Sequence, residues 1–401
     1  MVAGRRRALV SLATASAGLA LGRWFGADPL VAAALAQAPA PEGRLVATLP
    51  LGRLDRRAKA PLHTLLGSGL DARQFTDLSE LAPGRLITPA DQFYIRTAAP
   101  RSLPSPAAWQ IRLGGLVTQE TRIAVHDVRD WAQPMGAHLL ECAGNADPAN
   151  FGLLSAATWG GVPIGRVLDQ LRPTSQARRI RITGLDDDGQ SATSVPGAAW
   201  VFTRDELEER GAFLATDMNE AALTPHHGAP IRLVMPNYYG CSNIKWVTRI
   251  DAVADDEPAT TQMREFAART HQQGVPALAR EFHPPAIDLA ATPIRVEQWD
   301  VPDGRGAARQ TYRVVGIRWG GLSRRAPLTI RFGHRQPFVP VDYCPDADST
   351  TTWSLWTHTW RPERAGRYQI ALGVADPSIP ARRLDLFYYT REVDVAQVEG
   401  V

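Results

Sequence analysis

Two patterns of apolar and polar positions divide this chain. In its central part, short apolar runs such as 138–142 and 231–235 end in turns rich in glycine, asparagine and histidine, and helix-like segments lie between some of them. Residues 180–186 alternate apolar and polar positions before an acid-rich turn. From residue 293 onward we find only short alternating runs, at 310–319, 328–332, 353–360 and 368–372. The pattern predicts a mixed domain over residues 45–285 and a β-sandwich over residues 288–401.

Composition limits the classes of protein that the chain can belong to. Its 401 residues are enough for two domains and a leader, and 44% hydrophobic with 21% charged residues is typical of a globular protein. The net charge of +3 is small for this length. It therefore gives no reason to expect a nucleic acid or a membrane surface as a partner.

The first 38 residues have the composition of an export signal. Arg5, Arg6 and Arg7 precede a modest alanine-rich apolar run and then a tract of small residues. The run is short for a spanning helix, and consecutive arginines indicate the twin-arginine route, which carries folded proteins. We expect a periplasmic protein that the export machinery recognises, with ordinary secretion or an uncleaved anchor as alternatives.

Cys142 stands at the end of an apolar run, in a Cys-Ala-Gly-Asn turn. A thiol in such a place could ligate a soft metal or could be a buried structural cysteine. The three cysteines, Cys142, Cys241 and Cys344, show no spacing typical of zinc sites or of attached c-type haem. Electrons leaving a metal centre would therefore need a partner protein. Cys241 could be buried or could pair with Cys344.

A second stretch, residues 225–246, combines a His-Gly turn, a strand and a loop that ends in a lysine. Lysine occurs in the chain at Lys59 and Lys245, whereas arginine supplies the other basic positions. The loop at 240–245 offers backbone N–H groups, the Ser242 hydroxyl, the Asn243 amide and the Lys245 ammonium. Such a set of donors is suited to binding an anion.

Together the two stretches resemble the sulfite oxidase family of molybdopterin enzymes, in particular its exported bacterial sulfite dehydrogenases, and the resemblance runs from about Phe93 to the C-terminus. It implies an α+β fold: a molybdopterin-binding domain of the sulfite oxidase type, then an immunoglobulin-like sandwich that forms homodimers. It implies that the molybdenum-molybdopterin cofactor is bound, that Cys142 is the metal ligand, and that Arg96, at the end of a short strand over 91–96, orients the substrate.

The resemblance also implies a set of cofactor contacts. Two of them, Thr97 and Ala98, depart from the polar Asn-His pair of the family and would offer backbone N–H groups alone. The full set consists of Arg96, Thr97, Ala98, Cys142, Asp186, His227, Arg232, Ser242, Asn243, Ile244 and Lys245.

Two departures from the family bear on the substrate. Ala146 and Asp147 follow the cysteine turn where the family has two arginines, and Phe266 stands where we expect an active-site tyrosine. The first hypothesis is oxidation of sulfite to sulfate, with electrons passing to a separate cytochrome-type acceptor. The alternatives are a molybdenum enzyme for another sulfur compound, S-oxide or oxyanion, and a periplasmic binding or assembly protein without a redox role.

Overall fold

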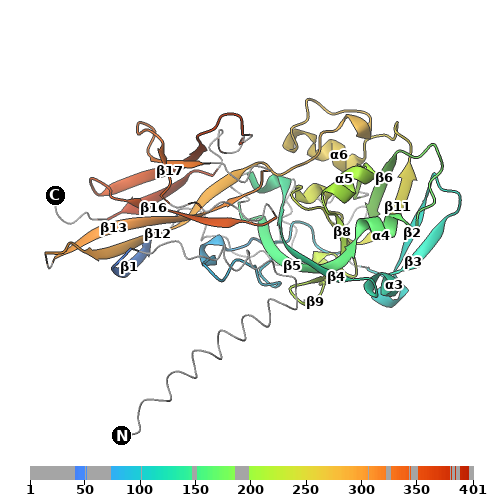
Figure 1. Ribbon diagram of the computed structural model, residues 1–401, viewed down its shortest axis with the longest axis horizontal. Coiled ribbons are helices and arrows are strands. Elements are labelled where there is room, and N and C mark those ends of the chain that lie inside the picture. Colours follow the sequence, from blue (N-terminus) through green and yellow to red (C-terminus); the bar gives the residue numbers. More distant parts are fainter. Residues whose placement is uncertain are drawn as a thin grey trace, which may run out of the picture.

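The structure is a computed structural model that describes residues 41–49, 51, 74–100, 102–146, 151–185, 198–305, 307–321, 327–342, 344, 351–379, 381, 384 and 389–396. Two lobes lie side by side along its long axis, with the C-terminal strands at the left of Figure 1. The predicted leader lies outside the described residues. None of the described helices is long and apolar enough to cross a membrane.

The first lobe contains two five-stranded sheets. One is mixed, because β2 and β11 pair in parallel while its other strands pair antiparallel. Its order is β3 (Thr121–Ala124), β2 (Gln110–Gly115), β11 (Val247–Val253), β6 (Arg179–Gly184) and β7 (Ala199–Phe202). The predicted strand at 180–186 is confirmed as β6, whose burial alternates residue by residue.

The second sheet of this lobe is antiparallel and leads to the cysteine turn. Its path is β10 (Arg232–Val234), β8 (Phe213–Met218), β5 (Leu154–Pro163) and β4 (Gln133–Glu141), and β9 (Ala221–Ala222) pairs with β8. Because β4 ends at Glu141, the next residue, Cys142, stands where the strand stops.

The α-helices in the described residues are short. The share of helix is therefore smaller than the predicted α+β fold implies. They have five or six residues each: α3 (Val125–Arg129), α4 (Ile164–Leu168), α5 (Arg204–Glu209) and α6 (Thr261–Phe266). Helix α5 begins at a capping box in which Thr203 and Glu206 each accept from the other's backbone N–H. The lobe is mostly sheet, since its apolar runs are too short for long amphipathic helices.

The C-terminal lobe contains two four-stranded antiparallel sheets. One is ordered β1 (Arg44–Leu49), β12 (Ala290–Pro302), β13 (Ala308–Trp319) and β16 (Ser354–Trp360). The other is ordered β15 (Val339–Pro340), β14 (Leu328–Phe332), β17 (Gly366–Val374) and β18 (Arg391–Val395). The sheets touch where the rings of Phe332 and Trp360 stack at 4.3 Å. The four strands expected here are confirmed, and an immunoglobulin-like identity stays a prediction.

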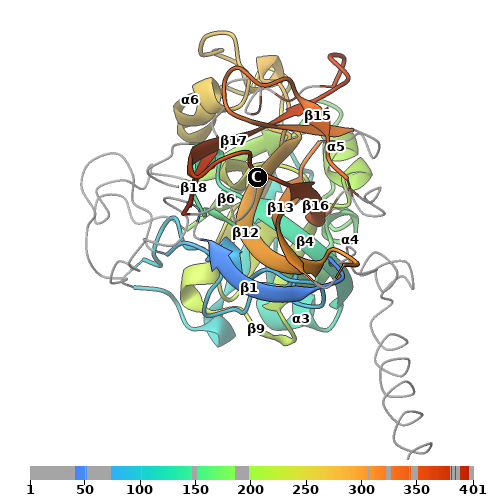
Figure 2. The same ribbon diagram turned by 90° about the vertical axis from the view of Figure 1, so that its left-hand side faces the viewer.

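One domain boundary differs from the prediction. We assigned residues from 45 onward to the central domain, but strand β1 lies against β12 of the C-terminal lobe, at the left of Figure 1 and toward the viewer in Figure 2. Arg44 lies opposite Asp300 and forms an ion pair of 3.0 Å with it. The two residues are far apart in the sequence, so local patterns do not predict this pairing. The N-terminal part of the described chain thus completes the edge of a C-terminal sheet.

The two lobes meet along β4. The amide of Leu139 donates to the carbonyl of Thr351 at 2.6 Å, and the Thr351 hydroxyl donates to the carbonyl of Ala137 at 2.9 Å. Nearby, the Trp353 indole donates to the carbonyl of Leu86 at 2.9 Å. The strand that leads to the cysteine turn is therefore held from the C-terminal lobe as well as from its own sheet.

Candidate active site

Cys142 lies in a closely hydrogen-bonded turn that lines a cavity. Its amide donates to the carbonyl of Leu153 and its carbonyl accepts from the amide of Asn145, both at 2.9 Å. The Gly144 amide contacts the sulfur at 3.4 Å. The thiol is buried, only 5% exposed, and forms no disulfide. A backbone fixed on both sides holds the sulfur at one place in the wall of the cavity.

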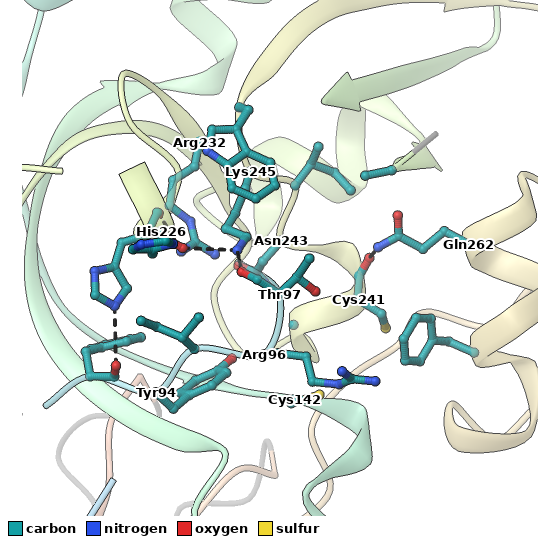
Figure 3. A pocket seen from close by; sticks show the side chains of 18 residues that line it. Tyr94, Arg96, Thr97, Cys142, His226, Arg232, Cys241, Asn243, Lys245 and Gln262 are labelled. Carbon is teal, nitrogen blue, oxygen red and sulfur yellow. Dashed lines mark hydrogen bonds between the residues drawn. The ribbon is translucent and has the colours of Figure 1, made fainter. Parts of the chain in front are cut away.

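Arg96 reaches the same cavity from a loop, so the predicted strand over 91–96 is wrong. The reason is Gln74, whose side-chain amide donates to the carbonyls of Asp91 and Phe93 at 2.6 and 3.0 Å. A neighbouring strand would need these carbonyls as hydrogen-bond acceptors. Because they are already used, strand pairing is limited to one bridge between Gln74 and Ile95. Figure 3 shows the Arg96 side chain extending from this loop on the Cys142 side of the cavity.

The His-Gly turn forms a short 3₁₀ helix, Pro225–His227, and Gly228 follows it with a φ of 104°. A side chain at Gly228 would meet Arg232 Cβ at 3.0 Å, so glycine serves both the backbone angle and the close approach. His227 uses both ring nitrogens locally, with Nδ1 at 2.7 Å from the Thr224 hydroxyl and Nε2 at 3.3 Å from the Phe93 carbonyl. Burial lowers the pKa of His227 to about 4, which keeps the ring neutral.

His226 also lines the cavity, although it is not among the predicted cofactor contacts. Its Nδ1 accepts from the amide of Ala99 at 3.0 Å, which connects the His-Gly turn to the loop after Arg96. The His-His pair was visible in the sequence. Both rings contact the neighbouring loop, His226 at Ala99 and His227 at Phe93. These contacts depend on the 3₁₀ turn, which is not evident from residue spacing.

Two cations stand at the opposite side of the cavity from Cys142 (Figure 3). The Lys245 ammonium donates to the carbonyls of Thr97 and His226 at 2.5 and 3.0 Å and lies 4.3 Å from the Trp246 ring. Arg232 is 6% exposed, and its Nη1 donates to the His227 carbonyl at 3.0 Å. Burial lowers the pKa of Arg232 to about 10, and its Nε has no hydrogen-bond partner among the described residues.

The remaining predicted contacts fall into three groups. Thr97, Asn243 and Ile244 line the cavity, although the Asn243 amide is used inside its own loop, where it accepts from the Met235 amide at 2.7 Å. Ser242 and Ala98 are absent from the described lining, and the Ser242 hydroxyl donates to the Tyr239 carbonyl at 2.9 Å. Asp186, together with Asp147 from the altered turn, lies outside the described residues.

Helix α6 supplies another part of the cavity lining. Gln262 and Phe266 reach it from helix α6, and the Gln262 amide donates to the carbonyl of Cys241 at 2.5 Å. Cys241 itself is buried and is not joined to Cys344 by a disulfide. Phe266, at the position where a tyrosine is expected, lines the same cavity as Cys142.

Tyr94 and Gly240 bring the cysteine turn and the lysine loop together. Burial raises the pKa of Tyr94 above its usual range, and the neighbouring Cys142 adds a smaller effect in the same direction. The Tyr94 hydroxyl therefore stays protonated. A side chain at Gly240 would meet Tyr94 Oη at 3.1 Å and Cys142 Cα at 3.5 Å. The lysine loop can approach the cysteine only because position 240 has no side chain.

These residues fit a molybdopterin cofactor. A buried thiol is a soft ligand, and a buried arginine with an unpartnered Nε, next to a lysine, suits an anionic group such as a phosphate. The described lining contains Arg96, Arg232 and Lys245 and no carboxylate. No cluster of three or more His, Cys, Asp or Glu side chains that could hold a metal ion occurs in the described residues.

Comparisons with known proteins agree with this geometry. A family model described as the oxidoreductase molybdopterin binding domain matches residues 98–261. An NADPH nitrate reductase of Beauveria bassiana is 32% identical over 290 residues, which are 63% of this chain and 31% of that protein. A sulfite oxidase of Gallus gallus is 25% identical over 321 residues, which are 75% of this chain and 69% of that protein.

Among solved structures, the crystal structure of the sulfane dehydrogenase SoxCD from Paracoccus pantotrophus matches with a TM-score of 0.61 and 16% sequence identity. The match covers 88% of this chain and 91% of that chain, and it shows a shared fold. The chain aligns with about a third of the length of the fungal nitrate reductase and about two thirds of the chicken sulfite oxidase.

Proposed function

This chain belongs to the sulfite oxidase family of molybdopterin-dependent oxidoreductases, and from that membership we propose that it oxidises sulfite to sulfate and passes the electrons to a separate cytochrome-type acceptor. The observation that carries the proposal is the position of Arg96, which lines one cavity with the buried Cys142 thiol. A guanidinium there can bind a dianion beside the metal ligand.

Each group of residues has a distinct task. The cofactor supplies two-electron chemistry when it is bound. Cys142 holds it through the thiolate, and Arg232 and Lys245 offer positive charge to its anionic part. Arg96 orients sulfite, which gains one oxygen atom derived from water as two protons and two electrons leave. Phe266 adds an apolar ring to the lining of the same cavity.

The experiment is an anaerobic optical titration of the molybdenum-loaded protein with sulfite, recorded in the thiolate-to-metal absorption. Bleaching at one equivalent of sulfite would support the proposal, and it requires no knowledge of the natural acceptor. A spectrum that sulfite leaves unchanged, in protein that dithionite bleaches, would exclude sulfite as the reductant.

A second candidate is the reduction of an oxyanion such as nitrate, or of an S-oxide. Two observations favour it: the aligned nitrate reductases, and Phe266 in the cavity in place of a tyrosine hydroxyl. The same sample tests this candidate, because nitrate added after stoichiometric dithionite would restore the oxidised spectrum. Family membership makes the chain an enzyme, so the binding or assembly protein considered above is not proposed.

We propose periplasmic export by the twin-arginine route on the basis of Arg5, Arg6 and Arg7. Replacement of the three arginines by lysine should leave molybdenum-loaded protein in the cytoplasm, as cell fractionation would show. Continued export would point to ordinary secretion instead. A homodimer through the C-terminal lobe is likewise a proposal, which sedimentation of the purified protein would test.

A further inference from the structure

The carboxylate of Glu141, the residue before Cys142, is fully buried and is bound from both lobes. Its Oε1 accepts from the Asn145 amide at 2.9 Å and from the Tyr389 hydroxyl at 3.3 Å. Its Oε2 accepts from the Trp319 indole at 2.8 Å. Asn145 belongs to the cysteine turn, whereas Trp319 ends strand β13 and Tyr389 precedes β18, so the C-terminal lobe supplies two of these donors.

A carboxylate without solvent is costly unless donors surround it, and loss of one donor leaves part of that cost uncompensated. The donors from the C-terminal lobe are themselves fixed by packing. The ring of Tyr389 lies 5.3 Å from Trp319 and 5.2 Å from Phe151, and both donors are about 2% exposed. The position of Glu141 is therefore set by the C-terminal lobe as firmly as by its own strand.

Asn145 passes this constraint to the thiol. Its amide nitrogen donates to Glu141, while its Oδ1 accepts from the amides of Gly152 and Leu153 at 3.0 and 2.9 Å. Its backbone amide donates to the Cys142 carbonyl, and the Cys142 amide donates to the Leu153 carbonyl. Cys142 therefore sits inside a ring of hydrogen bonds that Glu141 and Asn145 close.

We propose that Glu141 is a positioning residue for the molybdenum ligand, and that the C-terminal lobe fixes the Cys142 thiolate through Trp319, Glu141 and Asn145. The proposal rests on Cys142 being the metal ligand, and it is independent of which substrate reacts. It gives the C-terminal lobe a role in the geometry of the metal site that dimerisation does not require.

Two matched tryptophan variants test the proposal. Trp319→Phe and Trp353→Phe each remove one indole hydrogen bond between the lobes, to Glu141 and to the Leu86 carbonyl respectively. Both indoles are buried, and we expect each variant to lower the melting temperature by about 2–4 °C. Only Trp319→Phe removes a hydrogen bond to the residue that directly precedes Cys142.

The first measurement uses cofactor-free protein and the rate at which iodoacetamide alkylates Cys142, located by mass spectrometry. We expect Trp319→Phe to raise this rate about tenfold over Trp353→Phe, because the turn opens locally more often. In loaded protein, Trp319→Phe alone should shift the thiolate-to-molybdenum absorption and lower molybdenum retention by about 10-fold, as loss of an outer contact of a metal ligand does.

Glu141→Gln is a second variant, in which the added NH₂ group faces a donor and one hydrogen bond is lost. It should reproduce the alkylation and absorption changes of Trp319→Phe, and if it does not fold, the tryptophan pair still gives the answer. Equal alkylation rates and equal spectra for the two tryptophan variants would overturn the proposal. Retention of molybdenum by Cys142→Ser would instead contradict the assignment of Cys142 as the metal ligand. The rates at which Cys142 is alkylated in the other variants do not depend on that assignment.

Discussion

The two sides of the cavity are stabilised in opposite ways. On the cysteine side, hydrogen bonds from neutral groups surround a buried carboxylate and fix the thiol turn. On the cation side, Arg232 and Lys245 are directed at backbone carbonyls, and the described lining holds no carboxylate to balance them. The cysteine side therefore provides position, whereas the cation side gathers positive charge that an anionic ligand would stabilise.

The largest effect should come from the cysteine side. Cys142→Ser keeps a residue of nearly the same size and replaces the proposed soft ligand with a hard one. We expect molybdenum-dependent turnover to fall by more than about 100-fold, since even outer contacts of a ligand contribute 10- to 100-fold. Metal analysis and turnover of purified protein provide the measurement. Full molybdenum-dependent activity in this variant would contradict the ligand assignment.

On the cation side, Arg232→Met should weaken binding of the cofactor and stabilise the cofactor-free protein. Burial lowers the pKa of Arg232 to about 10, so the charge is less favourable in the fold than in the unfolded chain. Without the charge, we expect the free energy of unfolding to rise by about 1 kcal/mol or more, and cofactor retention to fall about 30-fold. Denaturant unfolding and cofactor analysis measure the two changes.

The matched control is Arg295→Met in the C-terminal lobe. Arg295 is also largely buried but forms an ion pair of 2.9 Å with Glu297. Its loss should destabilise the protein by about 3 kcal/mol, because a buried carboxylate is left with fewer partners. If both variants lost stability equally, the cation side would not hold an unfavourable charge, and the contrast between the two sides would disappear.

Features that depend on a few adjacent residues could be predicted from the sequence. The alternation in β6, the strands of the C-terminal lobe and the glycine turns at 228 and 240 are local, and so is the position of Cys142 after an apolar run. Lys245 was identifiable because lysine is rare in the chain. Cys142, Gly240 and Lys245, which all line the cavity, are among these locally predictable residues.

The features that the sequence did not predict depend on distant partners. Glu141 meets Trp319, 178 positions further along the chain, and β1 pairs with β12 across about 250 positions. The predicted strand before Arg96 became a loop because the Gln74 side chain took its carbonyls. In each case a side chain or strand far away in the sequence determines the local structure. The spacing of nearby residues does not predict such a contact.

A third prediction concerns pH on the cation side. Burial, together with the charges of Lys245 and Arg232, lowers the pKa of His227 from 6.5 to about 4. Between these values the unfolded chain binds a proton and the fold does not, so stability is full above pH 6.5 and falls as pH drops toward 4. We expect a loss of about 3 kcal/mol over this window in cofactor-free protein, measured by denaturant unfolding.

His227→Gln should be less stable than the natural protein at neutral pH but should lose less stability on acidification. Burial also lowers the pKa values of His138 and His358, so the stability of both proteins still falls in part as the pH drops. The difference between the two pH profiles therefore isolates His227. Parallel profiles would mean that the cation side does not disfavour a third positive charge.

The smallest effect should come from Phe266→Tyr, which adds one hydroxyl to the lining of the cavity. A new hydrogen bond to a bound oxyanion contributes about 1 kcal/mol. If the proposed sulfite oxidation holds, kcat/KM for sulfite should therefore rise about fivefold. Phe282→Tyr is the control, since Phe282 is partly buried and is absent from the described lining of the cavity. An increase confined to Phe266→Tyr would show that the missing hydroxyl limits sulfite oxidation. Equal values for the two variants would show that sulfite lies away from helix α6, so that the cysteine side and Arg96 alone define its position.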